Sequence, residues 1–233
     1  RPGFVTTPDA RHMAIAHARP GDDPALALLA TGAPVGLLGL EPQTRRRNRM
    51  NGVVESWPDG GALTIAVRQS FGNCPKYIVT REPQAVAPLP AAAQALGPAL
   101  DEAALALIGR SDTLFIASAS SRPGDGELRG EGVDVSHRGG QPGFIGIARS
   151  ANGQVQLTLP DYPGNQFFMT LGNLSVNPKA GLLFVDYEGG GLLHLAADAE
   201  LVWDAAQRFV RLTVREGVWR PGVLPWRWWP TNG

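Results

Sequence analysis

The chain has 233 residues, of which 43% are hydrophobic and 18% charged, and its formal net charge is zero. This balance excludes a bulk electrostatic attraction to nucleic acid or to an anionic membrane. The single cysteine, Cys74, excludes an internal disulfide and a cysteine-ligated zinc or cluster site, and we expect it to be a small buried hydrophobe. No apolar run approaches the ~18 residues that span a bilayer, and no cleavable leader is evident. A soluble, cytoplasmic protein is therefore expected.

Glycine and proline separate short apolar blocks along the chain, which is typical of many short strands joined by tight turns. In the first third of the chain, apolar stretches predict strands at 4–7, 13–16, 35–40, 49–55 and 63–69. Asp23-Pro24 supplies an N-cap and a first-turn proline, which predicts a short helix over 25–30 that ends before Gly32.

A Pro/Ala-rich stretch over 82–98 is predicted to be a linker, and a helix is expected over 100–108. The remainder predicts a second short helix over 165–174 and strands at 113–118, 133–136, 144–148, 155–159, 181–187, 192–202 and 209–218. A polar, glycine-rich loop or hairpin is expected over 122–132. The tail tryptophans, Trp226, Trp228 and Trp229, either stack on a ligand or, as we prefer, pack the tail onto the core.

Part of the chain occurs twice. Three Gly/Pro motifs recur in order at spacings of 140, 143 and 145 residues: Pro2-Gly3-Phe4 as Pro142-Gly143-Phe144, Pro20-Gly21 as Pro163-Gly164, and Gly36-Leu37-Leu38 as Gly181-Leu182-Leu183. A slowly growing spacing is what two diverged copies of one unit with small loop insertions would produce.

The duplication predicts two units, residues 1–84 and 111–233, joined by a linker and helix over 85–110. Each copy runs strand, strand, short helix, strand, strand, strand, an order typical of an antiparallel, Greek-key-like barrel. The expected fold class is therefore mainly β with a few short helices, in two tandem barrels. The first barrel is incomplete at its N-terminus and would leave strand edges unpaired, so we expect the natural protein to continue before Arg1.

Motifs in both copies carry a family resemblance. In the second copy they are Asp134-Val135-Ser136-His137-Arg138-Gly139-Gly140, Pro142-Gly143-Phe144, Leu159-Pro160-Asp161-Tyr162, Gly164-Asn165, Leu171-Gly172-Asn173-Leu174, Asn177-Pro178 and Gly181-Leu182-Leu183-Phe184. In the first copy they are the arginine-rich segment 45–52 and Phe71-Gly72-Asn73-Cys74-Pro75. In this order they resemble the pyridoxamine 5'-phosphate oxidase-like superfamily, the FMN-binding split barrels, over 133–203 and, less closely, over 35–77.

The resemblance implies barrels of the split type, with FMN bound non-covalently between two copies. An internal pseudo-dimer would then replace a homodimer or add to one. It also implies an FMN-dependent oxidoreductase that accepts electrons from a nicotinamide or another small molecule, with no nucleic-acid or membrane partner. The oxidase itself has Ser-Arg-Lys where this chain has Gly164-Asn165-Gln166, and its C-terminal substrate motif is missing here. Oxidation of pyridoxamine phosphate is therefore not expected.

The residues predicted to contact the cofactor are Arg46, Arg47, Arg49, Ser136, His137, Arg138, Gly139, Asp161, Asn165 and Asn173. In a strand, alternation would point Arg45, Arg47 and Arg49 to one face, where forked donors suit a phosphate or a flavin edge. The alternative is a solvated edge that discourages aggregation.

The other predicted contacts also have two interpretations. The run from His137 to Gly140 forms either an anion-binding nest or a plain glycine-rich turn. Asp161, Asn165 and Asn173 bracket the short helix, where polar groups can bond flavin or phosphate oxygens. Capping of the helix is the more frequent use of an asparagine such as Asn165.

No catalytic residue is assigned. The four histidines, His12, His17, His137 and His194, are too scattered for a metal motif, and no Ser/His/Asp order supports a hydrolase. The alternatives to a flavin oxidoreductase are a barrel that holds FMN, FAD, haem or a deazaflavin without turnover, and a structural module of a larger redox protein. Because Leu192–Leu195 replaces the arginine-rich strand in the second copy, we expect one polar flavin site to remain.

Overall fold

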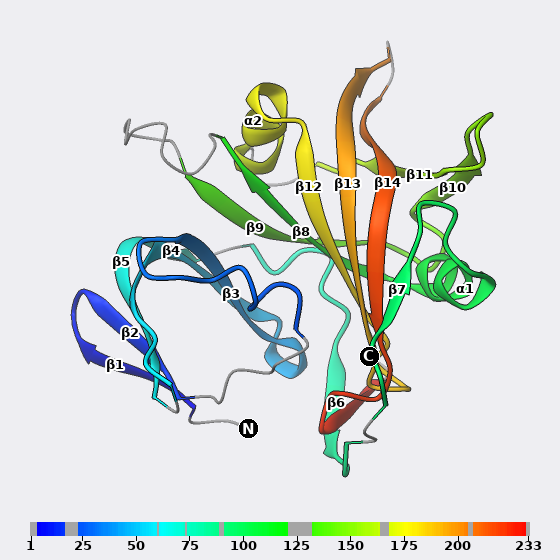
Figure 1. The fold of residues 1–233 in the computed structure, drawn as a ribbon. Coiled ribbons are helices and arrows are strands. Elements are labelled where there is room, and N and C mark those ends of the chain that lie inside the picture. Colours follow the sequence, from blue (N-terminus) through cyan, green and yellow to red (C-terminus); the bar gives the residue numbers. More distant parts are fainter. Residues whose placement is uncertain are drawn as a thin grey trace.

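The computed structural model describes residues 4–16, 23–59, 61–72, 74–88, 91–120, 132–163, 168–204 and 207–231. These residues form mainly β structure, as the sequence predicts, with two α-helices among three antiparallel sheets. Figure 1 shows the two larger sheets side by side, and the small sheet of β6 and β15 below them. Within the described part of the chain, neither α-helix is long and apolar enough to cross a membrane.

The first sheet contains the five strands of the N-terminal third in the order β1-β2-β5-β4-β3. Its elements are β1 (Val5–Asp9), β2 (His12–Ile15), β3 (Pro34–Glu41), the 3-10 helix η1 (Pro42–Thr44), β4 (Arg46–Ser56) and β5 (Leu63–Gly72). The predicted helix over 25–30 is wrong, because residues 24–28 form only turns. The Asp23 side chain does accept hydrogen bonds from the amides of Ala25 and Leu26, at 3.0 and 3.2 Å. Six residues before a glycine are too few to offset the cost of helix nucleation.

The second sheet has the order β10-β11-β14-β13-β12-β8-β9, and β7 also pairs with β14. Its strands are β7 (Gln94–Leu96), β8 (Thr113–Ala119), β9 (Val133–Gly139), β10 (Gly146–Arg149), β11 (Val155–Pro160), β12 (Lys179–Val185), β13 (Leu192–Trp203) and β14 (Arg208–Arg220). The helices are α1 (Glu102–Arg110) and α2 (Met169–Val176). Asp101 caps α1 by accepting a hydrogen bond from the Ala104 amide at 2.8 Å.

The linker and the tail pair with each other, which the sequence did not predict. Strand β6 (Arg81–Ala85) is antiparallel to β15 (Trp226–Pro230), and β7 also falls inside the expected linker. Trp228 packs edge-on against Tyr187, with ring centroids 5.8 Å apart. The tail therefore packs onto the protein at this ring, as preferred from the sequence.

The two large sheets share strand order, register and the position of a bulge. The order β1-β2-β5-β4-β3 corresponds to β10-β11-β14-β13-β12. Pro34 pairs with Val53 in the first sheet, and 145 residues later Lys179 pairs with Asp198. The ladder to the next strand shifts register after Asn51 and again, 145 residues later, after Ala196. The 145-residue spacing of the sequence motifs therefore also relates equivalent backbone positions in the two sheets.

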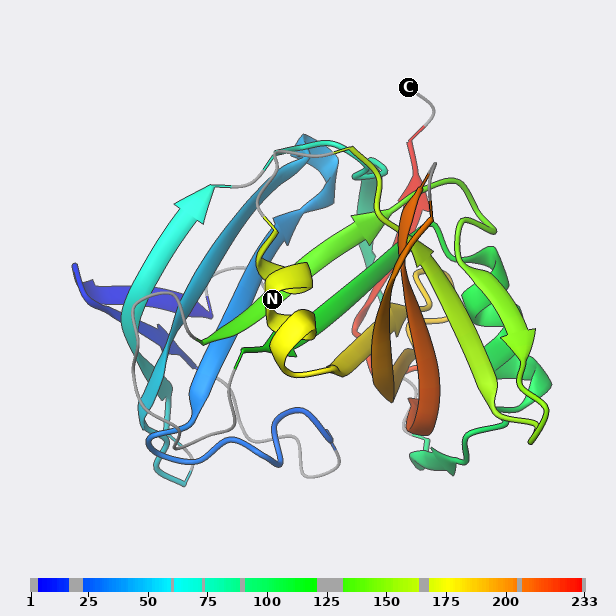
Figure 2. The same ribbon diagram turned by 90° about the horizontal axis from the view of Figure 1, so that it is seen from above.

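Each sheet has its own hydrophobic core. The larger core belongs to the second sheet and α1 and α2, and it includes Phe184, Leu193 and Leu212, which are fully buried. The smaller core lies on the first sheet around Val54, Ile65 and other residues. The described strands form no closed barrel. Instead β9, at the edge of the second sheet, lies beside β3, with α2 next to the junction (Figure 2).

Candidate functional site

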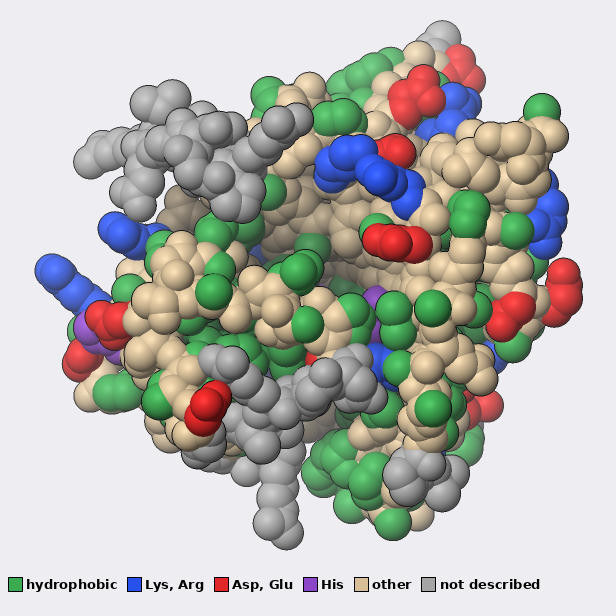
Figure 3. All heavy atoms as spheres, viewed as in Figure 1, with side chains coloured by type: hydrophobic (Ala, Val, Ile, Leu, Met, Phe, Trp, Pro, Cys, Tyr) green, Lys and Arg blue, Asp and Glu red, His purple; other side chains and the backbone are tan. Residues whose placement is uncertain are grey.

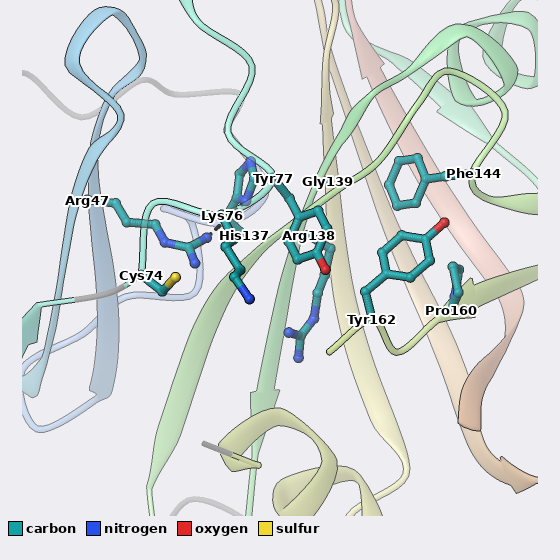
Figure 4. A pocket seen from close by; sticks show the side chains of 10 residues that line it. All are labelled: Arg47, Cys74, Lys76, Tyr77, His137, Arg138, Gly139, Phe144, Pro160 and Tyr162. Carbon is teal, nitrogen blue, oxygen red and sulfur yellow. Dashed lines mark hydrogen bonds between the residues drawn. The ribbon is translucent and has the colours of Figure 1, made fainter. Parts of the chain in front are cut away.

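A pocket of about 70 Å³ lies where the first sheet meets β9. Residues from both halves of the chain line it: Arg47, Cys74, Lys76, Tyr77, His137, Arg138, Gly139, Phe144, Pro160 and Tyr162. The face of the molecule drawn in Figure 3 is hollowed between the two large sheets. In Figure 4, Arg47 and Cys74 reach in from the first sheet, and Phe144, Pro160 and Tyr162 form the opposite wall.

The pocket is basic. Arg47, Lys76 and Arg138 line it, and none of the described residues that line it is acidic. Asp134 and Asp161 act on the charge of Arg138 from outside the lining. Three cations around a small cavity favour an anion, and guanidinium groups can bind a phosphate with two parallel hydrogen bonds.

Arg47 is held by His137. The guanidinium Nη1 of Arg47 lies 3.0 Å from Nδ1 of His137 (Figure 4). Because arginine can only donate, Nδ1 must accept, and the proton of the neutral ring is on Nε2. Burial, together with the positive charges of Arg47 and Arg138, lowers the pKa of His137 to about 3. His137 is therefore neutral near pH 7 and fixes Arg47 without adding charge.

Arg138 lines the pocket without a described hydrogen-bond or ion-pair partner. Its side chain is half-buried. Burial lowers its pKa, whereas the charges of Asp161 and Asp134 raise it. Burial also lowers the pKa of Arg47, and the Nε of Arg47 is buried without a hydrogen-bond partner among the described atoms. The guanidinium groups of Arg47 and Arg138 thus line the pocket from both sides of the junction, where an acceptor would satisfy them.

Two tyrosines stack at the pocket. Tyr77 and Tyr162 have ring centroids 5.5 Å apart and an interplanar angle of 28°, and both are about 41% exposed. The hydroxyl of Tyr77 donates to the carbonyl of Pro163 at 3.1 Å. Tyr77 has a φ of 64°, a left-handed conformation that is rare for an aromatic residue. The pair offers planar aromatic surface beside the cationic cavity.

Gly139 is required by packing rather than by an anion-binding nest. A Cβ at this position would overlap the backbone carbonyl of Tyr77, and one at Gly140 would overlap the ring of Phe144. Neither glycine has the positive φ that a nest requires. The run from His137 to Gly140 therefore brings Arg138 to the pocket by close backbone contact.

Arg49 and Ser136 lie in a buried network next to the pocket. Arg49 forms an ion pair with Asp134 and donates to the hydroxyl of Ser136 at 2.7 Å. Thr170, at the start of α2, donates to the other oxygen of Asp134 at 2.8 Å. All four side chains are buried. The network joins β4, β9 and α2, and its groups are used in holding these elements together.

The remaining predicted contacts lie outside the pocket lining. Arg46 is exposed, and Arg45 is in a left-handed turn before β4 rather than on the strand face with Arg47. Asp161 accepts a hydrogen bond from Nε of Arg208 at 2.6 Å. Asn173 is buried and donates to Ser118 at 3.2 Å. Asn165 lies outside the described residues. Of the ten predicted contacts, Arg47, His137, Arg138 and Gly139 line the pocket.

Several lining residues were not predicted as ligand contacts. Four of them lie within or directly after the motifs of the family resemblance: Lys76, Tyr77, Phe144 and Tyr162. The motifs drew attention to these segments but did not predict that the four side chains line a pocket. Cys74 was expected to be a small buried hydrophobe, yet it is only partly buried and lines the pocket. Their convergence depends on contacts between residues 60 to 90 positions apart, which local patterns do not reveal.

Comparisons with known proteins assign no family. No family model matches the chain, and no curated protein matches it. One solved structure aligns with 51% of this chain and 76% of its own at 19% identity, with a TM-score of 0.26. A similarity this low supports no conclusion on fold or function. The site must therefore be interpreted from its own chemistry.

That chemistry is binding of an anion beside an aromatic surface. In the part of the chain that the structure describes, no group of three or more His, Cys, Asp or Glu side chains could hold a metal ion. The pocket has no lining carboxylate, and its histidine is neutral near pH 7. Its three cations suit an anion, and its two tyrosines offer a planar surface beside that anion.

Proposed function

We propose that this protein binds FMN at the junction of two tandem split-barrel copies and acts as a flavin-dependent oxidoreductase. The sequence resemblance implies a flavin between two copies, and the cationic pocket lies between the two sheets of matching order and register. The trio of Arg47, Lys76 and Arg138 is the observation that carries the proposal, because it supplies three positive charges and no lining acid for a phosphate.

The cavity fits the phosphate group rather than the whole cofactor. A cavity needs about 10–15 Å³ to hold one water, so a cavity of about 70 Å³ holds roughly five water-sized atoms. A phosphate group has five heavy atoms. The flavin ring would then lie beyond the enclosed volume, where the exposed rings of Tyr77 and Tyr162 offer a stacking surface.

Bound FMN would supply the hydride or electron transfer. The chain's own residues would bind and orient it. Arg47, Lys76 and Arg138 would bind the phosphate, and His137 would hold Arg47 in place through Nδ1. A nicotinamide or another small molecule is the proposed electron donor.

A second candidate is a carrier that binds a phosphate-bearing cofactor without turnover. The observation that favours it is the lack of a lining carboxylate together with a histidine that is not protonated near pH 7. Such a pocket offers cations for an anion, but neither a carboxylate nor a protonated histidine for proton transfer. The two candidates differ in whether a nicotinamide reduces the bound flavin.

The first test is the visible spectrum of the purified protein, chromatography of any cofactor released by heat, and titration with FMN. We expect flavin absorption or uptake of FMN. Losing one cation should weaken FMN binding by roughly tenfold or more in Arg138→Gln and Lys76→Gln, since a hydrogen bond to a charged group contributes about 1.5–3 kcal/mol. Arg46→Gln is the matched control, because Arg46 is exposed and lies outside the pocket lining. A colourless protein that takes up no FMN would refute the proposal.

A further inference from the structure

The junction between the two large sheets is separable. Among the described strands, none of the first sheet shares a backbone hydrogen-bond ladder with a strand of the second, although β3 lies beside β9. The two hydrophobic cores have no residue in common. Units with separate cores and a polar junction move relative to each other unless something holds them.

Polar side chains make several of the described connections across this junction. Arg49 reaches Asp134 and Ser136, Arg47 reaches His137, and Arg220 of β14 donates to Asp23 at 2.7 Å. Charged contacts of this kind lose part of their attraction to desolvation.

The positive side chains of the pocket repel one another across the junction. The pocket places Arg47 of the first sheet and Arg138 of the second in one cavity. The charges of Arg49 and Arg138 act unfavourably on Arg47, whereas those of Asp161 and Asp134 act favourably on Arg138. Lys76 adds a third positive charge. Like charges across a junction repel, and the buried Nε of Arg47 has no hydrogen-bond acceptor among the described atoms. An oxyanion with two negative charges would reverse the sign of this interaction.

We propose that a phosphate dianion bound between Arg47, Lys76 and Arg138 holds the two sheets together, so that the site is fully assembled only when it is occupied. This inference rests on the anion pocket of the proposed function, but not on the flavin ring. Binding energy from the phosphate group closes the junction, and the closed junction presents Tyr77 against Tyr162. The ligand class is a phosphate monoester or inorganic phosphate.

The test uses the whole chain and inorganic phosphate, with chloride at equal ionic strength as the reference. Phosphate at about 100 times its dissociation constant should raise Tm by about 5–10 °C. Hydrogen exchange should slow at β3 and β9, which meet at the junction, but not at β1 and β10, which lie at the far edges of the sheets. Alkylation of Cys74 by iodoacetamide should also slow, and as the single cysteine it reports on the pocket alone.

Arg138→Gln distinguishes a phosphate-binding residue from a residue that only supports the fold. Removing this cation relieves repulsion with Arg47 but also ends the attraction of Asp161 and Asp134, so Tm without phosphate should change little. The response to the same phosphate concentration should fall to about half or less, as a tenfold or greater loss of affinity requires. Lys76→Gln repeats the test at an exposed side chain whose loss does not threaten folding. Arg46→Gln should retain the full response. A phosphate response that persists undiminished in both Arg138→Gln and Lys76→Gln would overturn the proposal.

The result separates this inference from the proposed function. If phosphate slows exchange at β3 and β9 but FMN does not bind, the junction proposal stands and the flavin proposal fails. If FMN binds while exchange at β3 and β9 is unchanged by FMN and by phosphate, the junction proposal fails and the flavin proposal stands. An equal slowing in all strands would also overturn the junction proposal, because it would indicate general stabilisation.

Discussion

The first and second sheets share a frame but use equivalent positions differently. Arg47 and Arg49 of β4 face the second sheet, where they meet His137 and the buried carboxylate of Asp134. The residues 145 positions later on β13 are Leu192 and His194, and burial lowers the pKa of His194. The same backbone register therefore carries an arginine-rich junction in one copy only.

The two sheets also differ in how much core supports them. Among the described residues, six buried hydrophobic side chains form the core of the first sheet and twenty-one that of the second, so the first sheet has less burial of its own. A small unit with little burial is marginally stable by itself. We infer that the first sheet depends on the junction and that changes there act mainly on it.

The largest effect is expected from the buried ion pair. Asp134→Asn removes the charge that pairs with Arg49 and should lower the free energy of unfolding by about 3–5 kcal/mol, because a buried guanidinium loses its partner. Urea unfolding measures it. The control is Asp198→Asn, which breaks an exposed ion pair with Lys179 and should cost less than about 1 kcal/mol. Equal losses in the two variants would show that the buried Arg49–Asp134 pair contributes no more to stability than the exposed Lys179–Asp198 pair.

A smaller effect is expected where the two halves touch through a glycine. Gly139→Ala places a Cβ against the carbonyl of Tyr77 and should cost about 1–3 kcal/mol, with weakened phosphate binding. Gly181→Ala is the matched control within a strand, since its Cβ would lie 3.7 Å from Ala117, an ordinary contact. Thermal unfolding and phosphate titration of both variants measure the difference. Normal phosphate affinity in Gly139→Ala would contradict the assignment of this contact to the pocket.

The pH dependence of stability tests His137. Its pKa is about 3 in the folded chain and about 6.5 when unfolded, so the unfolded state binds the extra proton between these values. The contribution to stability is complete above pH 6.5 and is lost as the pH falls toward 3, at up to about 1.4 kcal/mol per pH unit. From pH 6.5 to 5.5, the wild type should lose about 1 kcal/mol more stability than His137→Gln, because the unfolded histidine is only half protonated at pH 6.5. Parallel pH profiles from urea unfolding would show that His137 is not protected from protonation.

The smallest effect compares one position in both copies. Gly36 and Gly181 are 145 residues apart, but a Cβ on Gly36 would lie 3.3 Å from Asn51 and 3.5 Å from Val135 of the other sheet. Gly36→Ala should therefore cost up to about 1 kcal/mol. Gly181→Ala should be neutral or stabilise by about 0.4–1 kcal/mol through the unfolded chain. Identical Tm changes would mean that β9 does not restrict the first sheet.

Most strands and the spacing of the repeated motifs could be predicted from the sequence alone. Alternating apolar residues and the Gly/Pro punctuation predicted the core strands of both sheets, and the motif spacing predicted the shared order. These features are local or periodic, so they are legible without a structure. The prediction of a helix over 25–30 was wrong because capping signals do not show whether six residues can offset the free-energy cost of helix nucleation.

Tertiary structure decided the junction and the pocket. Arg49 is paired with Asp134, Arg47 with His137, and Tyr77 with Tyr162, across separations of about 85 to 90 residues. The same packing placed β9 beside β3 in place of a closed barrel and turned the expected linker and tail into paired strands. Strand periodicity tells which face a side chain is on, but not which distant element covers that face. That choice depends on the free energy of the whole assembly, which no local pattern contains.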